Sequence, residues 1–292
     1  MSRFILSAFA DEIDTDLNTQ MDVLEQHGIK HIEMRGVGGR LIVDYTLDEA
    51  REIKRALDAR GFRLSALGSP TGKIGITDEF GPHLEQFKHT VELARLLECR
   101  YIRMFSFYIP KGEAPEDYRD EVIARWSQFV QAAAGSGLVL LHENEHGIYG
   151  DTPERCLDLV QSLQSDQVQL IFDFANFVQC GVVNYPDAYE LLEKHIAYIH
   201  VKDALRTNGS VVPAGDGDGH VREILQRLSA SGYDGFLSLE PHLWSYSDFS
   251  RLEADSPGYA LPEGSAKRFA VAVHAIKKLL SEIQDEHHRE EA

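Results

Sequence analysis

LVLLHE (residues 138–143) is the first of four apolar runs that decide the fold, and VQLIFD (168–173), IAYIH (196–200) and GFLSLE (235–240) follow it. Continuous apolar runs of this length are typical of strands buried on both faces, as in a parallel sheet. Each run ends in a side chain that can bind a metal ion: Glu143, Asp173, His200 and Glu240. The carboxyl ends of barrel strands meet at one face, so we expect these four side chains to converge.

Strand-like and helix-like segments alternate along the whole chain. Four further strands are expected at 4–10, 31–35, 63–68 and 101–107, and helices at 16–27, 47–60, 83–97, 117–134, 153–163, 185–194, 220–229 and 265–283. Eight units in 292 residues favour a single (β/α)8 TIM barrel, an α/β fold that takes about 250 residues. An open dinucleotide-binding sheet would carry a glycine fingerprint after its first strand, where this chain has ADEIDTD. We therefore predict one barrel domain over 1–284 and a frayed tail over 285–292.

Composition restricts the partners and the compartment. The chain has 29 basic and 47 acidic residues and a net charge of −18, which repels nucleic acid and anionic membranes. Its three cysteines form no CxxC motif, and we find neither a signal peptide nor an apolar run long enough for a membrane span. We expect a cytoplasmic protein with no nucleic-acid or membrane partner.

The four strand-end side chains together indicate one divalent metal ion. Three carboxylates gathered without a cation would repel one another, and a divalent ion removes that cost. An oxygen-rich set with a single imidazole suits manganese, magnesium or cobalt, and zinc is possible. The alternative is that strand ends are polar merely because they approach solvent.

Side-chain direction alternates along a strand, which predicts which neighbours share the barrel interior. If Glu143 points inward, then Leu141 does so too and His142 faces the helices. If His200 points inward, Lys202 lies on the same side. Lys202 could then bind a substrate oxygen, or it could form a salt bridge with an acidic neighbour.

Two glutamates that flank a bound substrate can perform acid–base chemistry. One carboxylate would remove a proton next to a polarised carbonyl and the other would return it, through an enediolate. Glu143 and Glu240 are the candidate catalytic pair. Glu33 ends the second strand and could contact the far end of the substrate or pair with Arg35.

Two loops could also lie near the pocket. Lys73, in GSPTGK (68–73), could cover the mouth of the pocket or be an ordinary loop lysine. The loop AGDGDGH (214–220) lies where many barrels bind phosphate, but its aspartates would repel an anion. This favours an unphosphorylated keto-sugar or polyol as the substrate.

Several of these motifs resemble those of a known family. LLHENEHG (140–147), FDFANF (172–177), IHVKDA (199–204) and GFLSLEP (235–241) are similar to the four metal-strand motifs of the sugar phosphate isomerase/epimerase-like family. This is the xylose-isomerase-like barrel superfamily, with ketose 3-epimerases, hydroxypyruvate isomerases, inosose dehydratases and endonuclease IV. AFADEI (8–13) and HIEMR (31–35) resemble its first two strands, so the likeness covers nearly the whole chain.

The resemblance implies roles for individual residues. It makes Glu143, Asp173, His200 and Glu240 the metal ligands, and the two glutamates the proton-transfer pair. Arg206 lies six residues after His200, where ketose 3-epimerases carry an arginine that holds a substrate hydroxyl. Asn176 replaces the histidine of their Asp-x-x-His motif; an asparagine can hydrogen-bond a hydroxyl but cannot take up a proton near neutral pH.

We therefore expect a divalent-metal-dependent isomerase or epimerase that acts on a small keto-sugar or polyol. A dehydratase of the inosose type could use the same site. A DNA-repair enzyme like endonuclease IV would need further histidines and a basic surface, and a non-catalytic sugar-binding barrel is the third alternative. Relatives of this kind often assemble as dimers or tetramers, so a homo-oligomer is a further expectation.

Overall fold

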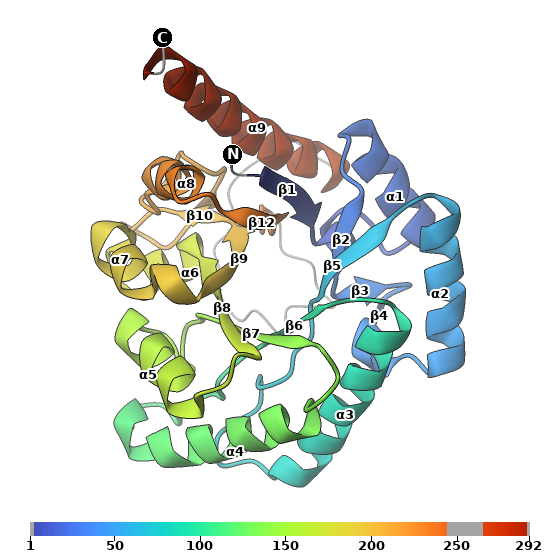
Figure 1. The fold of residues 1–292 in the computed structure, drawn as a ribbon, viewed down its shortest axis with the longest axis vertical. Helices are drawn as coiled ribbons and strands as arrows, with labels where there is room; N and C mark the ends of the chain where they lie inside the picture. The colour runs from blue at the N-terminus through green and yellow to red at the C-terminus, as the bar shows by residue number, and fades with distance from the viewer. Residues whose placement is uncertain (1–2, 244–264, 291–292) are drawn as a thin grey trace.

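The structure, a computed structural model, describes residues 3–243 and 265–290. Eight parallel strands form a closed barrel, in the order β1, β12, β9, β8, β7, β6, β5 and β2 around the ring (Figure 1). They are β1 (Arg3–Ala8), β2 (His31–Met34), β5 (Arg63–Leu67), β6 (Tyr101–Met104), β7 (Val139–Glu143), β8 (Val168–Asp173), β9 (Ile196–Val201) and β12 (Asp234–Leu239). The predicted (β/α)8 TIM barrel is confirmed.

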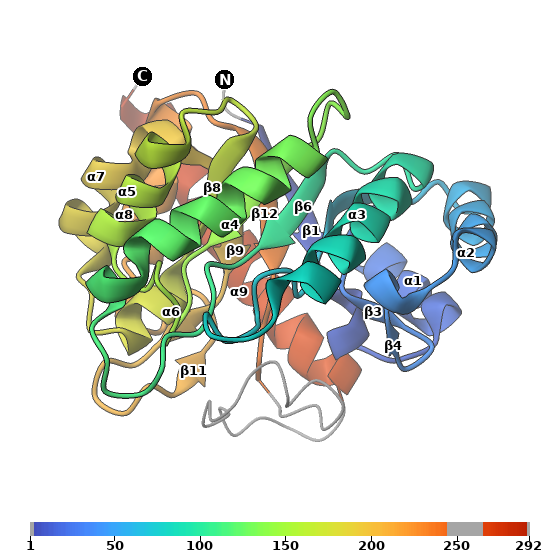
Figure 2. The same ribbon diagram turned by 90° about the horizontal axis from the view of Figure 1, so that it is seen from below.

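Helices surround the barrel on its outer side, and α4 crosses in front of the strands in the side view (Figure 2). They are α1 (Leu17–Gln26), α2 (Leu47–Ala59), α3 (Phe80–Leu96), α4 (Arg119–Ala132), α5 (Pro153–Leu163), α6 (Phe174–Gln179), α7 (Tyr189–Leu192), α8 (Val221–Ala230) and α9 (Ser265–Glu290). The local sequence explains where several of these helices begin. At α2, for example, Thr46 and Glu49 form a capping box that satisfies two backbone N–H groups. Among the described residues, no helix is both long and apolar enough to cross a membrane.

The barrel interior holds a small apolar cluster of its own below the carboxyl ends of the strands, formed by Ala66, Val139, Leu141, Ile171 and Tyr198. The predicted alternation is confirmed on β7, because His142 lies on the outer side against Trp126 and Ser106. Burial lowers the pKa of His142 to about 3, so this ring is neutral and structural.

The structure differs from the sequence prediction in three helical regions, of which the first two follow β8. Helix α6 begins immediately after β8 and was not predicted, because Asp173 is both the last strand residue and the helix N-cap. The expected helix over 185–194 is instead a short α7 between a kinked segment (Asn184–Ala188) and a 3-10 turn (Glu193–His195). Tyr185 is extended there, with φ −134° and ψ 133°, because a residue that precedes a proline is disfavoured in the helical region.

Helix α9 continues to Glu290, so residues 285–290 are helical rather than a frayed tail, and 291–292 lie outside the described residues. No glycine or proline follows Ile283 to end the helix. Arg222 and Gln226 of α8 also bind Glu286, at 3.1 and 2.8 Å, which holds this part of α9 to the barrel. The described residues also form two small antiparallel hairpins: β3 (Gly36–Val37) with β4 (Arg40–Leu41), and β10 (Asp203–Ala204) with β11 (Val211–Val212).

Candidate metal centre

The candidate centre lies at the carboxyl ends of four neighbouring strands. Glu143 ends β7, Asp173 ends β8, His200 is the penultimate residue of β9, and Glu240 directly follows β12. Each offers one ligand atom, and these four atoms lie within 4.8 Å of one another. All four side chains are buried. The predicted convergence of the four strand ends is confirmed, and their role as metal ligands is developed below as a proposal.

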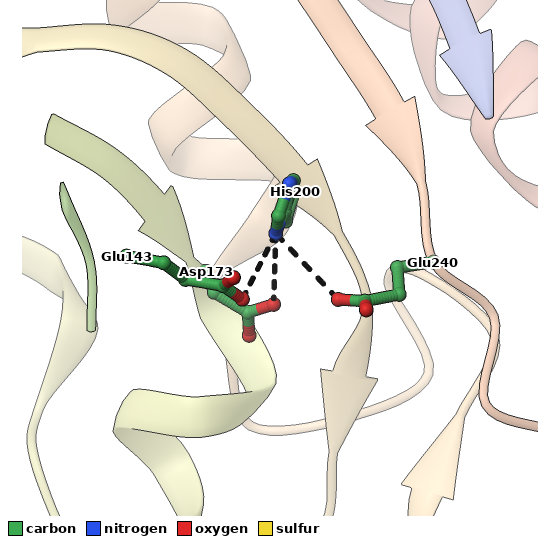
Figure 3. A group of neighbouring side chains, drawn as sticks. All are labelled: Glu143, Asp173, His200 and Glu240. Atoms are coloured by element: carbon green, nitrogen blue, oxygen red, sulfur yellow. Dashed lines mark hydrogen bonds and ion pairs between the residues drawn. The ribbon is translucent and has the colours of Figure 1, made fainter. Parts of the chain in front are cut away.

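The three carboxylates surround one nitrogen of the imidazole (Figure 3). His200 Nδ1 lies 3.0 Å from Glu143 Oε1, 3.5 Å from Glu240 Oε2 and 3.8 Å from Asp173 Oδ2. Glu240 approaches from the side opposite to Glu143 and Asp173. Asp173 Oδ2 is buried and accepts no hydrogen bond, although Lys202 Nζ lies 3.3 Å away, whereas Oδ1 accepts the N–H of Asn176. A buried carboxylate oxygen that accepts no hydrogen bond, beside two more carboxylates and an imidazole, suits the binding of a divalent cation.

Burial alone would raise the pKa of each carboxyl, but charged neighbours reverse this for both glutamates. His200 and Arg103 outweigh burial at Glu143 and lower its pKa. Lys202 and His242 outweigh it at Glu240 and hold its pKa well below the ordinary value. Burial raises the pKa of Asp173 to about 7 although Lys202 opposes the shift. The two glutamates are therefore ionised near neutral pH, which suits the ligation of a cation and the removal of a proton.

Arg103 of β6 links the two glutamates. Its Nη1 lies 3.4 Å from Glu143 Oε2 and 3.5 Å from Glu240 Oε1, and its Nη2 donates to the carbonyl of Gly68. The guanidinium lies over the rings of Phe9 and Phe105, at 4.8 and 5.1 Å from their centroids. A buried positive charge at this point can stabilise negative charge that develops between the glutamates.

A second arginine, directly after β2, reaches the centre. Arg35 Nη1 lies 3.4 Å from Glu240 Oε1, while its Nε donates to Asp11 Oδ2 at 2.8 Å. From the sequence, Arg35 was expected only as a partner of Glu33, and the turn that contains Asp11 served only to exclude a dinucleotide fold. The signal that could have found both residues is their position just after the first two strands.

The structure also groups Glu12, Glu240 and His242 as potential ligands of one ion. His242 Nε2 lies 3.4 Å from Glu12 Oε1 and 3.3 Å from Glu240 Oε1. Sequence reasoning missed Glu12 and His242, although both follow strand ends closely. They surround Glu240 and so belong to the environment of the same centre.

Three residues predicted to bind substrate lie at the centre but contact its ligands. Lys202 Nζ lies 3.3 Å from both Asp173 Oδ2 and Glu240 Oε2, so the salt-bridge alternative is the one observed. Asn176 Nδ2 donates to Glu143 Oε1 at 3.3 Å. Glu33 is completely buried and contacts His200 Nε2, which is 3.0 Å from its Oε2, rather than Arg35. Their substrate-binding role stays a prediction.

The structure brings Lys73 near the centre but not Arg206. Lys73 Nζ lies 3.1 Å from Glu145 Oε2 and 4.4 Å from the centroid of Phe105, the ring that Arg103 also covers. Arg206 is exposed, and its guanidinium donates to the carbonyls of Gly181 and Val182 at 3.0 and 2.7 Å. Within the described residues we find no contact between Arg206 and the four candidate ligands.

The glycine loop after β11 closes on an internal carboxylate. Asp203 Oδ1 accepts the N–H groups of Ala204 and Gly219, and Oδ2 accepts those of Gly215 and Gly217, at distances of 2.8 to 3.1 Å. A Cβ on Gly217 would lie 2.4 Å from Asp203 Oδ1, so the close approach requires glycine there. The backbone donors that could hold a phosphate are thus already occupied.

A closed barrel with a buried acidic centre at the carboxyl ends of its strands defines a class of α/β enzymes that bind small molecules. Within this class, the chain belongs to the xylose isomerase-like TIM barrel family, whose sequence profile matches residues 21–255.

Two solved structures show how widely this fold is shared. The structure of L-ribulose 3-epimerase has a TM-score of 0.76 and 18% identity, over 100% of this chain and 99% of that one. An IolI protein with a bound zinc atom has a TM-score of 0.69 and 17% identity, over 96% and 99% of the two chains. At such identities the likeness concerns the fold.

A curated sequence relative also matches part of the chain. An uncharacterized protein of Methanocaldococcus jannaschii is 26% identical over 167 residues, which is 54% of this chain and 56% of that protein. The chain thus spans little more than half the length of this relative.

Proposed function

We propose that this protein is a divalent-metal-dependent isomerase or epimerase of a small keto-sugar or polyol, which acts through an enediolate. One observation carries the proposal. Glu143 and Glu240, both held ionised, extend from different strands and contact the same two cationic groups, His200 and Arg103. Two carboxylates on opposite sides of one small volume are the groups that a proton removal and return requires.

Glu143, Asp173, His200 and Glu240 would hold the cation. The bound cation would polarise a carbonyl and a neighbouring hydroxyl of the substrate, which makes the intervening C–H proton more acidic. Manganese, magnesium or cobalt suits this oxygen-rich set, and the IolI protein, a structural neighbour, binds zinc.

Glu143 and Glu240 would share the proton transfer. One ionised glutamate would take the proton from the carbon next to the carbonyl. The other glutamate, after taking up a proton from solvent, would return it to the opposite face or to the neighbouring carbon. Return to the same carbon from the other side inverts its configuration, whereas return to the neighbouring carbon exchanges aldose and ketose. Arg103, within 3.5 Å of both glutamates, would stabilise the negative charge of the enediolate.

The hydrogen bonds that Asp203 accepts favour an unphosphorylated substrate. The loop over 214–220 occupies the position where barrels commonly bind phosphate, but Asp203 already accepts three of its backbone N–H groups. A phosphate would have to displace a buried carboxylate and then remain near Asp216 and Asp218. We therefore expect a ketose to be preferred over the corresponding sugar phosphate.

The test uses protein loaded with manganese, a panel of ketoses in deuterated water, and NMR. We expect deuterium to enter the carbon next to the carbonyl while the mass of the carbon skeleton is conserved. Glu143→Gln and Glu240→Gln should each abolish the exchange, whereas Glu190→Gln, an exposed glutamate, should leave it unchanged. Exchange at the wild-type rate in either site variant would refute the two-glutamate assignment.

The same experiment separates the other functions. Loss of water with formation of an ultraviolet-absorbing dione would identify a dehydratase. Metal-dependent cleavage of a duplex that contains an abasic site would identify a DNA-repair enzyme. Tight binding of a sugar without turnover, with any of the four metals, would identify a non-catalytic sugar-binding barrel.

A further inference from the structure

Glu33 lies behind the proposed metal centre, on the Nε2 side of the His200 ring. It belongs to β2, is completely buried, and its two carboxylate oxygens lie 3.2 and 3.0 Å from His200 Nε2. The other ring nitrogen of His200, Nδ1, faces Glu143, Asp173 and Glu240. The imidazole therefore lies between the Glu33 carboxylate on its Nε2 side and the other three carboxylates on its Nδ1 side.

The position of Glu33 results from an irregularity in the barrel. The pairing of β2 with β5 shifts between Ile32 and Glu33, so that Ile32 lies opposite Leu64 and Glu33 opposite Ala66. Ser65 is the residue skipped by this shift, and it accepts a hydrogen bond from Tyr198 at 2.8 Å. Bulges near active sites commonly redirect a side chain, which here is that of Glu33.

Two aromatic rings restrict the orientation of the imidazole. Phe9 and Tyr198 meet the His200 ring edge to face, with centroids 5.2 and 5.8 Å away and interplanar angles of 76° and 84°. The ring plane is thus fixed by packing. Packing does not decide which nitrogen carries the proton of the neutral imidazole, because the two tautomers have the same shape.

The hydrogen bond to Glu33 determines which ring nitrogen keeps its hydrogen when a cation binds. Both ring nitrogens face carboxylates, Nε2 that of Glu33 and Nδ1 that of Glu143. A cation bound among the three other carboxylates would displace the hydrogen from Nδ1, whereas the hydrogen bond to Glu33 keeps the one on Nε2 and so leaves a lone pair on Nδ1. That lone pair points to the place where the three other carboxylates converge. We propose that Glu33 is a positioning residue that fixes His200 in the tautomer able to bind a cation through Nδ1. The inference rests on the proposed metal centre.

The experiment measures the affinity for the metal rather than turnover. Zinc and manganese, each alone, are titrated against a competing chelator with wild-type protein, Glu33→Ala and Glu33→Gln. Loss of such an outer partner typically weakens metal binding about 10- to 100-fold, so we expect the dissociation constant of Glu33→Ala to rise by up to about 100-fold. Glu33→Gln can still accept from Nε2 through its amide oxygen, and we expect a rise of about tenfold at most.

A matched control and a second measurement complete the test. Glu223→Ala removes an exposed carboxylate that lies 3.7 Å from another histidine, His220, and should leave the affinity unchanged. Nitrogen-15 NMR of the zinc-loaded wild-type protein should show His200 protonated at Nε2, and this measurement does not depend on whether a variant folds. A proton on Nδ1, or equal affinity of wild type and both Glu33 variants, would overturn the inference. If the wild-type protein bound neither metal, the proposed function itself would fail.

Discussion

Asp203→Asn tests how the loop over 214–220 is held closed. In the wild-type protein, both oxygens of one carboxylate accept four backbone N–H groups. Asparagine keeps the size of the side chain but replaces one oxygen with an NH₂ group that cannot accept. If the amide oxygen faces Ala204 and Gly219, the NH₂ group must face the N–H groups of Gly215 and Gly217.

The magnitude follows from these contacts. Two donors lose their acceptor, at about 1 kcal/mol each because the loop is partly exposed, and two others lose a charged acceptor, at about 0.5–1 kcal/mol each. The sum is a loss of about 3–4 kcal/mol in the free energy of unfolding. At about 2.1 cal/mol/K of unfolding entropy per residue, a chain of 292 residues gives a decrease in Tm of about 6 °C.

The assay is thermal unfolding and urea unfolding of Asp203→Asn beside Asp216→Asn. Asp216 is an exposed aspartate of the same loop, so its substitution removes the same charge without the four hydrogen bonds. We expect Asp216→Asn to match the wild-type protein within 0.5 kcal/mol, or about 1 °C. Equal stability of the two variants would show that the Asp203 carboxylate does not organise the loop, and the argument against a phosphorylated substrate would fail with it.

Two other predictions concern the arginine between the glutamates and the effect of pH. Arg103→Met should keep the fold but lower turnover about 100-fold, because it removes a buried charge next to the developing enediolate. Arg100→Met, at an exposed arginine, is the control. An unchanged rate in Arg103→Met would contradict the stabilising role of Arg103. His83 accepts the N–H of Gly72, and burial lowers the pKa of His83 to about 4. The unfolded chain gains this proton near pH 6.5, so stability falls as pH drops from about 6.5 to 4, by about 2 kcal/mol between pH 7 and 5. Urea unfolding at both pH values should show that His83→Gln loses about 2 kcal/mol less stability between pH 7 and 5 than the wild-type protein. An equal loss in the two proteins would contradict the prediction.

Most of the fold could be predicted because strands and helices leave strong local signals. β8 and α5 begin and end at the predicted residues, since an apolar run ends at Asp173 and a proline follows the capping Thr152. Helix α6 was missed because Asp173 serves as both strand end and helix cap. The end of α9 was misplaced because its polar last turns are held by contacts with α8, which the local sequence does not reveal.

The site could be predicted where the backbone alone determines position. The ends of four parallel strands must lie near one another, so the convergence of the four candidate ligands followed from their place in each strand. Arg206 lies in a loop, where the direction of a side chain depends on contacts such as those with Gly181 and Val182. Glu33 is on a strand, but the shift in pairing with β5 directs it beneath His200, and no local pattern signals such a shift.

The central claim is that one cation joins the ends of β7, β8, β9 and β12. The most direct measurement is an anomalous difference map from crystals of the protein soaked in manganese. We predict a single strong peak bound by Glu143, Asp173, His200 Nδ1 and Glu240. Density that shows no ion among these four side chains, in crystals where manganese is bound elsewhere or not at all, would contradict the account.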